Sequence, residues 1–409
     1  MGKQIGKSVK RVEDPRFIQG QGKYVANINL PNMAYVAVLR SPHAHAKINS
    51  INTDAAKAMD GVIDVFVGQD LIDGGVGKMP VIWQVPDNKI PDRWPLVPDK
   101  VRHVGDSVAA VVAEDPYIAR DALDMINVDY EVLKATTGAK ATTEDGKPLV
   151  HDEIENNISF KWGLGDREAC DKAFEEADHV VKLDLINQRL IANAMEPRAC
   201  AAQWTAATEN MTVWTTSQNP HIIRFGLSAV TLPMLDEHKL RVISPDVGGG
   251  FGSKIFHYPE EVIIPWIAKE INRPCKWVAT RSESFMTDSQ GRDHVQNCKM
   301  ALTSDGIITG LYVELHADMG AYLSSIAPLI PTVICITLFS GLYKNPGIWG
   351  ETTGTLTNTV PVDAYRGAGR PEASYLLERI VDVAAQELGI DPIELRRKNF
   401  IGKDEFPYQ

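Results

Sequence analysis

The stretches DVGGGFGSK (residues 246–254) and DAYRGAGRPE (residues 363–372) decide how this chain is interpreted. Both are dense in glycine, which permits positive φ and lets a backbone approach a ligand closely. Three consecutive glycines, Gly248 to Gly250, are entropically costly, and such a cost commonly marks backbone N–H groups that face a large anionic group. For either loop alone, a plain flexible turn is the alternative.

The first loop matches neither of the common nucleotide-binding motifs. A GxGxxG fingerprint fails because its sixth position is Ser253 when counted from Gly248 and Ile255 when counted from Gly250. No GxxxxGK[ST] phosphate loop occurs in the sequence. A nicotinamide-dependent dehydrogenase is therefore disfavoured, although the loop has the composition of a phosphate site.

Composition narrows the possible classes of protein. The chain has 409 residues, of which 44% are hydrophobic and 23% charged, as in a globular protein of two or three domains. Its net charge of −11 disfavours a nucleic-acid partner. Five cysteines without a CxxC pair predict reduced thiols in a cytoplasmic protein, and no iron–sulfur or zinc site within the chain. We expect no membrane partner, because the most apolar stretch, 326–339, is too short to span a bilayer and holds two prolines.

Hydrophobic patterning predicts a mixed α+β fold. We expect a small α/β domain over 1–135, a polar linker over 136–165, and a second region over 166–409. The Asp-Gly pair at 305–306 predicts a hairpin. The expected strands are 33–41, 61–68, 107–113, 126–133, 179–191, 210–218, 275–285, 296–322 and 350–359, and the expected helices are 115–125, 260–272, 370–389 and one that opens at 391.

Three motifs occur in a fixed order: WTTSQNPH (214–221), DVGGGFGSK (246–254) and AYRGAGRPE (364–372). Together they resemble the molybdopterin-binding large subunit of the xanthine dehydrogenase, aldehyde oxidase and aerobic carbon monoxide dehydrogenase family. Residues 11–48 and 101–123 are similar to the start of that subunit. The resemblance covers essentially the whole chain, but it extends only to the N-terminal half of the family's usual subunit.

The resemblance implies a hammerhead-type α/β domain followed by the first half of the molybdopterin-binding region, with the second half absent. The chain is then either a naturally split subunit or a fragment. The implied cofactor is a molybdopterin-type molybdenum cofactor, in a cytosine dinucleotide form. The implied partners are a chain with the second half, a 2Fe–2S subunit and an FAD subunit, in a dimer of heteromers. A truncated or non-catalytic family member that acts in assembly is the alternative.

The resemblance also assigns roles to residues of the three motifs. It places Gln218, Phe251 and Arg366 around the oxygen ligands of molybdenum and the pterin, where a guanidinium suits phosphate or carbonyl groups. Each residue also has an explanation without a cofactor. Gln218 would cap a turn at the end of a strand, Phe251 would be a core aromatic that anchors a glycine turn, and Arg366 would form a surface or interface salt bridge. The remaining expected cofactor-binding residues are Gly249, Gly250, Gly252, Ala364 and Tyr365.

No catalytic residue is assigned in this chain, because the family's general base is a glutamate of the absent half. Glu196, in AMEPRAC, is a tempting substitute, but its Glu-Pro context favours a structural role. His43 and His45 have the spacing of a metal pair, yet in the family this stretch is a structural turn.

Departures from the family's patterns bear on the substrate. Purine-oxidising members carry a glutamate where this chain has Ile255, a second aromatic where it has Ala368, and an arginine near the position of Ile334. Carbon monoxide oxidisers carry a cysteine where this chain has Gly367. A pocket lined by Ile255 and Ala368 would be roomy and mostly apolar. We therefore expect an aldehyde or an aromatic N-heterocycle as the small-molecule substrate, oxidised by water-derived hydroxylation.

Overall fold

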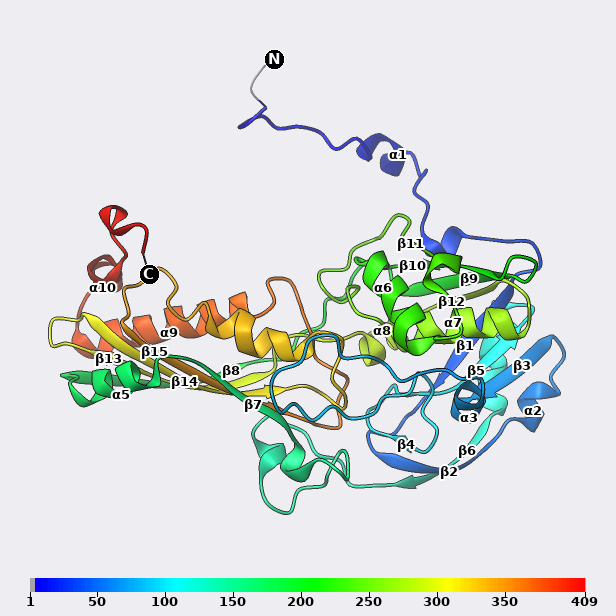
Figure 1. Cartoon of the computed structure of the whole chain (residues 1–409), viewed down its shortest axis with the longest axis horizontal. Helices are drawn as coiled ribbons and strands as arrows, with labels where there is room; N and C mark the ends of the chain where they lie inside the picture. The colour runs from blue at the N-terminus through cyan, green and yellow to red at the C-terminus, as the bar shows by residue number, and fades with distance from the viewer. Residues whose placement is uncertain (1–3, 409) are drawn as a thin grey trace.

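The computed structural model describes residues 4–408 and forms two lobes joined by long connecting segments (Figure 1). One lobe contains a seven-stranded and a three-stranded sheet, and the other a five-stranded sheet. Helices pack on these sheets, so the mixed α and β content confirms the predicted fold class. Between residues 4 and 408, no helix combines the length and the apolar character needed to cross a bilayer.

The seven-stranded sheet is the centre of its lobe. Its strand β5 is buried along its whole length, which explains the unbroken apolar run SVAAVVA. In spatial order the strands are β11 (Leu240–Ile243), β10 (Asn210–Thr215), β9 (Ala199–Thr205), β12 (Cys275–Val278), β1 (Ala34–Arg40), β5 (Ser107–Ala113) and β3 (Val62–Val67).

Strand β1 joins two distant parts of the sequence. It is antiparallel to β5 on one side and parallel to β12 on the other, where Ala34 pairs with Cys275. The small domain expected over 1–135 therefore shares a continuous sheet with later residues.

Helices cover both faces of this sheet. Val36 and Val38 of β1 face the core that contains helix α7 (Pro259–Glu270), whereas Ala37 packs near Ala119 of helix α4 (Pro116–Asp121). This alternation is the period-two pattern of a strand with both faces covered. The smaller elements of this lobe are α2 (Asp54–Lys57), α3 (Gly68–Asp73), α6 (Pro220–Gly226), α8 (Arg281–Thr287) and the three-stranded sheet β4 (Lys100–Val101), β2 (Ala46–Asn52) and β6 (Asn127–Val132).

The five-stranded sheet carries a long helix on one face. Leu376 and Ile380 of α9 (Arg370–Leu388) pack into the core formed with Leu311 of the sheet. On the other face, Gly310 lies against Ala173 of α5 (Arg167–Glu175). The strand order is β7 (Ile158–Gly165), β15 (Gly347–Thr355), β14 (Ile308–Asp318), β13 (His294–Leu302) and β8 (His179–Asn187), and α10 (Pro392–Asn399) follows α9.

Several predicted elements are confirmed and two need correction. The Asp-Gly pair at 305–306 lies in the hairpin turn that connects β13 to β14, and Gly389 caps α9 with φ of 65°. The linker expected over 136–165 is wrong at its end, because 158–165 forms β7 and pairs with β15. The strand expected over 275–285 ends at Val278, and a capping box between Thr280 and Glu283 starts α8 instead.

A buried ion cluster lies where the N-terminal strands meet α7. The Arg198 guanidinium lies 2.6 Å from Glu260 and 2.6 Å from Asp288, and Arg40 lies 2.5 Å from the other oxygen of Glu260. Burial disfavours ionisation of Glu260, but the two guanidinium groups outweigh burial and hold the pKa of this carboxyl far below its ordinary value. Arg198 also stacks on the ring of Tyr258, 3.7 Å from its centroid.

Replacing Arg198 with methionine should lower the free energy of unfolding by about 3–5 kcal/mol, because Glu260 and Asp288 would lose a buried partner. Arg397→Ala is the matched control: its ion pair with Glu394 is exposed, so a change of at most about 1 kcal/mol is expected. Urea unfolding followed by tryptophan fluorescence measures both. Equal effects of the two substitutions would show that the buried cluster does not stabilise the fold.

Candidate functional site

Gln218 follows strand β10 and is bonded twice to the first glycine loop. Its backbone N–H donates to the carbonyl of Lys254 at 2.7 Å, and its side-chain Oε1 accepts from the N–H of Gly252 at 3.0 Å. A Cβ on Gly250 would lie 2.3 Å from that same Oε1. Glycine at position 250 therefore leaves the space that the Gln218 amide occupies.

The second glycine loop meets the first through backbone contacts. The N–H of Arg366 donates to the carbonyl of Phe251 at 2.8 Å. Gly252 has φ of 108°, and a Cβ there would lie 2.4 Å from the carbonyl oxygen of Ala364. Only glycine suits both the conformation and the close approach.

The second loop is held in left-handed backbone conformations. Gly367, Ala368 and Gly369 have φ of 97°, 43° and 80°, and α9 begins at the next residue. Ala368 is in a region that L-residues rarely adopt, and such strain commonly occurs at functional sites. Here the strain turns the chain sharply between the Phe251 contact and the helix.

Three side chains at the junction of the loops are exposed. Gln218 and Arg366 are exposed, and Phe251 is 46% exposed, with φ of 54°. Within residues 4–408 the guanidinium of Arg366 has no hydrogen-bond or carboxylate partner, so the surface ion pair that would explain it without a ligand is not formed. The segments that carry these side chains are hydrogen-bonded to one another, through Gly252 N–H to Gln218 and through Arg366 N–H to Phe251.

The first loop has three consecutive unpaired N–H groups. In the described part of the chain, the N–H groups of Gly249, Gly250 and Phe251 donate to none of the chain's own oxygens. Buried or half-buried N–H groups seldom stay unpaired in a protein. Successive N–H groups in a turn form a concave site for an anionic or strongly hydrogen-bonding ligand. The loop therefore has the donors that a phosphate, an oxo group or a pterin requires.

Glu196 contacts the first glycine loop at Gly248 and Lys254. Its carboxylate accepts from the N–H of Gly248 at 2.7 Å and lies 3.2 Å from the ammonium of Lys254, which also donates to the Glu196 carbonyl at 2.8 Å. Burial lowers the pKa of Lys254, against the attraction of Glu196. These contacts give Glu196 a structural role, as its Glu-Pro context indicates.

Arg292 supports the second loop and was not identified from the sequence. Its buried guanidinium donates to the carbonyls of Tyr365 at 2.9 Å and Arg366 at 2.8 Å, and it lies 3.1 Å from Glu372. Its own φ is 66°. No local sequence pattern predicts this role, because the residues that Arg292 contacts are far away in the sequence.

The two residues expected to line a substrate pocket lie in one apolar cluster. Ile255 and Ala368 are both half-buried and pack against the group that contains Phe256 and Ala364. Ile334 joins the same cluster. The three positions at which the sequence departs from purine oxidisers are therefore close in space.

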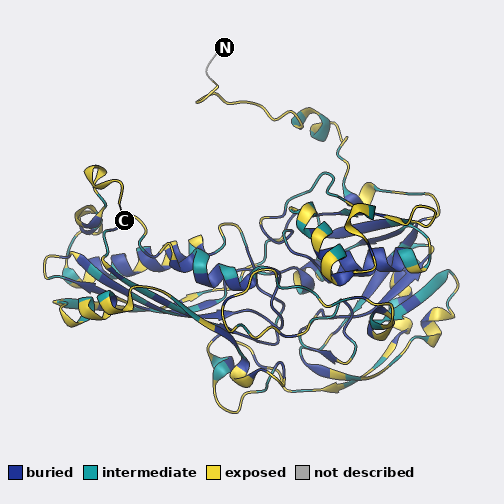
Figure 2. Ribbon diagram, viewed as in Figure 1, coloured by how far each residue is buried: buried dark blue, intermediate teal, exposed yellow. Residues whose placement is uncertain are grey.

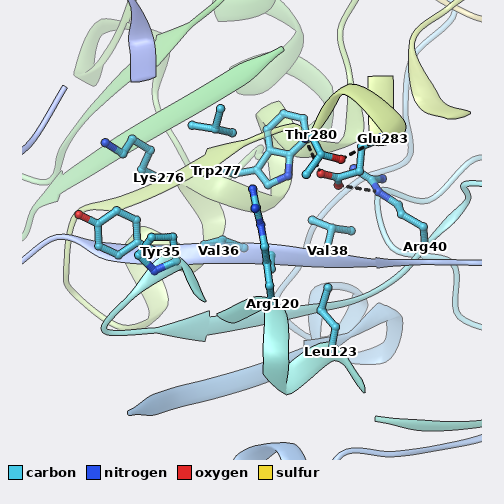
Figure 3. Close-up of a pocket in the computed structure, with 13 residues that line it drawn as sticks. Tyr35, Val36, Val38, Arg40, Arg120, Leu123, Lys276, Trp277, Thr280 and Glu283 are labelled. Atoms are coloured by element: carbon cyan, nitrogen blue, oxygen red, sulfur yellow. Dashed lines mark hydrogen bonds and ion pairs between the residues drawn. The ribbon is translucent and has the colours of Figure 1, made fainter. Parts of the chain in front are cut away.

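A separate cavity of about 380 Å³ lies between α4 and the seven-stranded sheet (Figure 3). Val38, Leu123 and Trp277 line its apolar part, and Arg120 extends across it (Figure 3). Its lining includes no residue of the two glycine loops, so it is distinct from the junction described above.

His45, which has the spacing of a metal ligand with His43, instead bonds to the carbonyl of Lys134.

Gly252→Ala should destabilise the chain far more than Gly146→Ala. Both glycines have positive φ, 108° and 78°, but a Cβ at position 146 would meet no atom within 4 Å. Backbone strain alone costs about 1–2 kcal/mol, which is the loss expected at position 146. At position 252 the clash with the Ala364 carbonyl adds to this backbone strain. The melting temperature of each variant measures the difference in stability. Equal shifts would show that the two loops do not need this close approach.

Two family models together match most of the chain. Residues 150–400 match the family model for a molybdopterin cofactor-binding domain, and residues 19–134 match the aldehyde oxidase and xanthine dehydrogenase a/b hammerhead domain. The chain is 35% identical to the carbon monoxide dehydrogenase large chain of Hydrogenophaga pseudoflava, over 97% of this chain and 50% of that protein. It therefore spans about half the length of that relative.

A second relative has a similar length to this chain. The chain is 31% identical to the nicotinate dehydrogenase large molybdopterin subunit of Eubacterium barkeri, over 97% of this chain and 89% of that protein. Among solved structures, quinoline 2-oxidoreductase from Pseudomonas putida 86 superposes with a TM-score of 0.94 and 33% identity, over 100% of this chain and 52% of that one. The chain belongs to the family of molybdopterin-binding large subunits of the xanthine dehydrogenase, aldehyde oxidase and aerobic carbon monoxide dehydrogenase type.

Proposed function

We propose that this chain holds a molybdenum cofactor at the junction of its two glycine loops, as one part of a multi-subunit hydroxylase. The observation that carries the proposal is that the two glycine loops and Gln218 are hydrogen-bonded together, with Gln218, Phe251 and Arg366 exposed and the N–H groups of 249–251 unpaired. When bound, the cofactor supplies two-electron oxidation of the substrate with oxygen derived from water.

The chain's own residues would hold that group by hydrogen bonds. The N–H groups of Gly249, Gly250 and Phe251 would donate to oxygens of the cofactor, and the Gln218 amide NH₂ is free to donate because its Oε1 already accepts from Gly252. Arg366 would supply a fixed positive charge toward the pterin. Ala364 and Tyr365 would contribute through their backbone, which the buried guanidinium of Arg292 positions.

The apolar cluster supports an aromatic N-heterocycle or an aldehyde as the substrate. Ile255, Ile334 and Ala368 replace the charged and aromatic groups of purine oxidisers, and they lie together. Gly367 stands where carbon monoxide oxidisers have cysteine. Similar proteins are named nicotine 6-hydroxylase large subunit and quinoline 2-oxidoreductase, which agrees with a heterocyclic substrate.

We further propose that a separate chain supplies the second half and its general-base glutamate. The relative from Eubacterium barkeri is of similar length and is named a large molybdopterin subunit, which supports a split subunit. A 2Fe–2S subunit and an FAD subunit would carry the electrons away, in a dimer of heteromers. The cytosine dinucleotide form of the pterin and a cytoplasmic location complete the proposal, and the five free buried cysteines are compatible with that location.

Purification from the native host tests the function. The preparation should contain molybdenum in proportion to this chain, a pterin that releases a cytosine nucleotide on hydrolysis, and co-purifying partner chains. A stable complex that lacks both molybdenum and pterin would refute the proposal.

Gln218→Ala should lower kcat in the assembled complex by roughly 10–100-fold while molybdenum content stays nearly unchanged, because one hydrogen bond to a charged group is lost. Asn219→Ala is the matched control, since the neighbouring amide makes no side-chain hydrogen bond within residues 4–408. Metal analysis and steady-state kinetics measure the two quantities. If molybdenum content falls in proportion to kcat, Gln218 acts by holding the loop that binds the cofactor, and the proposed contact with the reacting centre is wrong.

Ile255→Glu should impair oxidation of the native substrate without conferring purine oxidation. It would place a carboxylate in an apolar cluster, which costs several kcal/mol or raises the pKa of the new group until it is neutral. Ile255→Leu keeps the apolar character and serves as the control. Unchanged kcat/KM in the glutamate variant would show that residue 255 does not line the substrate pocket.

A further inference from the structure

The cavity between helix α4 and the seven-stranded sheet has the size of a small-molecule binding site. Its volume of about 380 Å³ lies within the range of roughly 300–1,000 Å³ that is common for such sites. The sheet on which it lies is largely buried, as the dark blue of its strands shows (Figure 2). Tyr35, Val38, Leu123 and Trp277 give the lining an apolar and partly aromatic character.

Four charged side chains line this cavity, and the most buried of them, Lys276, is already fully paired. Its ammonium donates to the carbonyl oxygens of Ala26 at 3.1 Å and Ile28 at 2.8 Å. It also donates to the side-chain oxygen of Asn29 at 2.9 Å. These three bonds use all three N–H groups of a lysine side chain. Lys276 therefore has no donor left for a ligand.

Arg40 and Glu283, at the end of the cavity opposite Lys276, are paired with each other (Figure 3). The Nε of Arg40 lies 3.3 Å from one oxygen of Glu283, and Arg40 also donates to the hydroxyl of Ser107 at 2.7 Å. The other oxygen of Glu283 accepts from the N–H of Thr280 at 2.9 Å. The charge of Glu283 is therefore already balanced within the chain.

Arg120 is the remaining charged side chain of the lining. Within residues 4–408 its guanidinium forms no hydrogen bond and no ion pair, although the chain contains more acidic than basic residues. Figure 3 shows the side chain extended across the cavity. Arg120 is exposed, so a ligand that enters from solvent can reach it. The cavity thus combines apolar walls with one unpaired positive charge.

We propose that this cavity binds a small aromatic carboxylate, whose ring occupies the apolar part and whose carboxylate pairs with Arg120. A guanidinium presents two parallel N–H groups that match the two oxygens of a carboxylate. An aromatic ring suits walls that include Tyr35 and Trp277. The lining shares no residue with the junction of the glycine loops, so this inference does not rest on the proposed cofactor.

Other classes of ligand fit the cavity less well. Arg120 would repel a cation, and a neutral apolar molecule would cover the guanidinium without pairing it, which is unfavourable. A phosphate dianion would require a second available cation, but Lys276 and Arg40 are both engaged. A single carboxylate therefore matches the one charge that the cavity offers.

Calorimetric titration of the full chain with naphthalene-2-carboxylate tests the class of ligand. We expect a Kd at or below about 1 mM, because a ligand of this size that fills an apolar cavity and forms one ion pair can reach such an affinity. Neutral 2-naphthamide should bind roughly 10–100-fold more weakly, because the bond to a charged group is lost. Hexanoate keeps the charge without the ring and should also bind more weakly. Equal or tighter binding of the amide or of hexanoate would overturn the proposal.

Arg120→Gln tests the position of the ligand. It should weaken binding of naphthalene-2-carboxylate roughly 10–100-fold, while the melting temperature of the free protein stays unchanged because Arg120 is exposed and unpaired. Arg241→Gln is the matched control and should leave the Kd unchanged. Arg241 is likewise exposed and unpaired within residues 4–408, but it lies on β11 at one edge of the same sheet.

Two further results would overturn the proposal. Binding that Arg120→Gln leaves unchanged would place the aromatic acid elsewhere, the junction of the glycine loops included. No binding of naphthalene-2-carboxylate at millimolar concentrations would show that the cavity does not take this class of ligand.

Discussion

The site depends on the contact between the carbonyl of Phe251 and the N–H of Arg366, which brings two glycine loops together. That bond requires the backbones to approach so closely that a Cβ on Gly252 would lie 2.4 Å from the carbonyl of Ala364. Because glycine occupies this point, the loops can be packed directly against each other. The segments that carry Gln218, Phe251 and Arg366 are then held together.

The surrounding structure holds this strained junction in place. The pair of Glu196 and Lys254 anchors the first loop, and Arg292 anchors the second through two carbonyls. The buried cluster around Arg198 holds α7, which begins at Pro259, shortly after the first loop. Buried charges of this kind stabilise only when every partner is present. Polar contacts of Glu196, Lys254 and Arg292 therefore hold the two loops in their observed conformations.

Local patterns in the sequence were sufficient for much of the fold and for the centre of the site. The apolar run of β5 and the helical spacing of apolar residues in α9 are local signals, and the density of glycines identified both loops. Long-range pairings leave no such signal. The parallel pairing of β1 with β12 and the grip of Arg292 on the second loop join residues far apart in sequence, so only the structure reveals them. Residues 158–165 were missed because their polar surroundings masked a strand.

The central claim is that molybdenum is held at the junction of the two glycine loops. Anomalous diffraction at the molybdenum edge, from crystals of the complex assembled in the native host, tests it directly. We predict an anomalous peak beside Gln218, Phe251 and Arg366, with cofactor oxygens within hydrogen-bond reach of the unpaired N–H groups of 249–251. A molybdenum peak elsewhere on the chain, or none in an active complex, would contradict it.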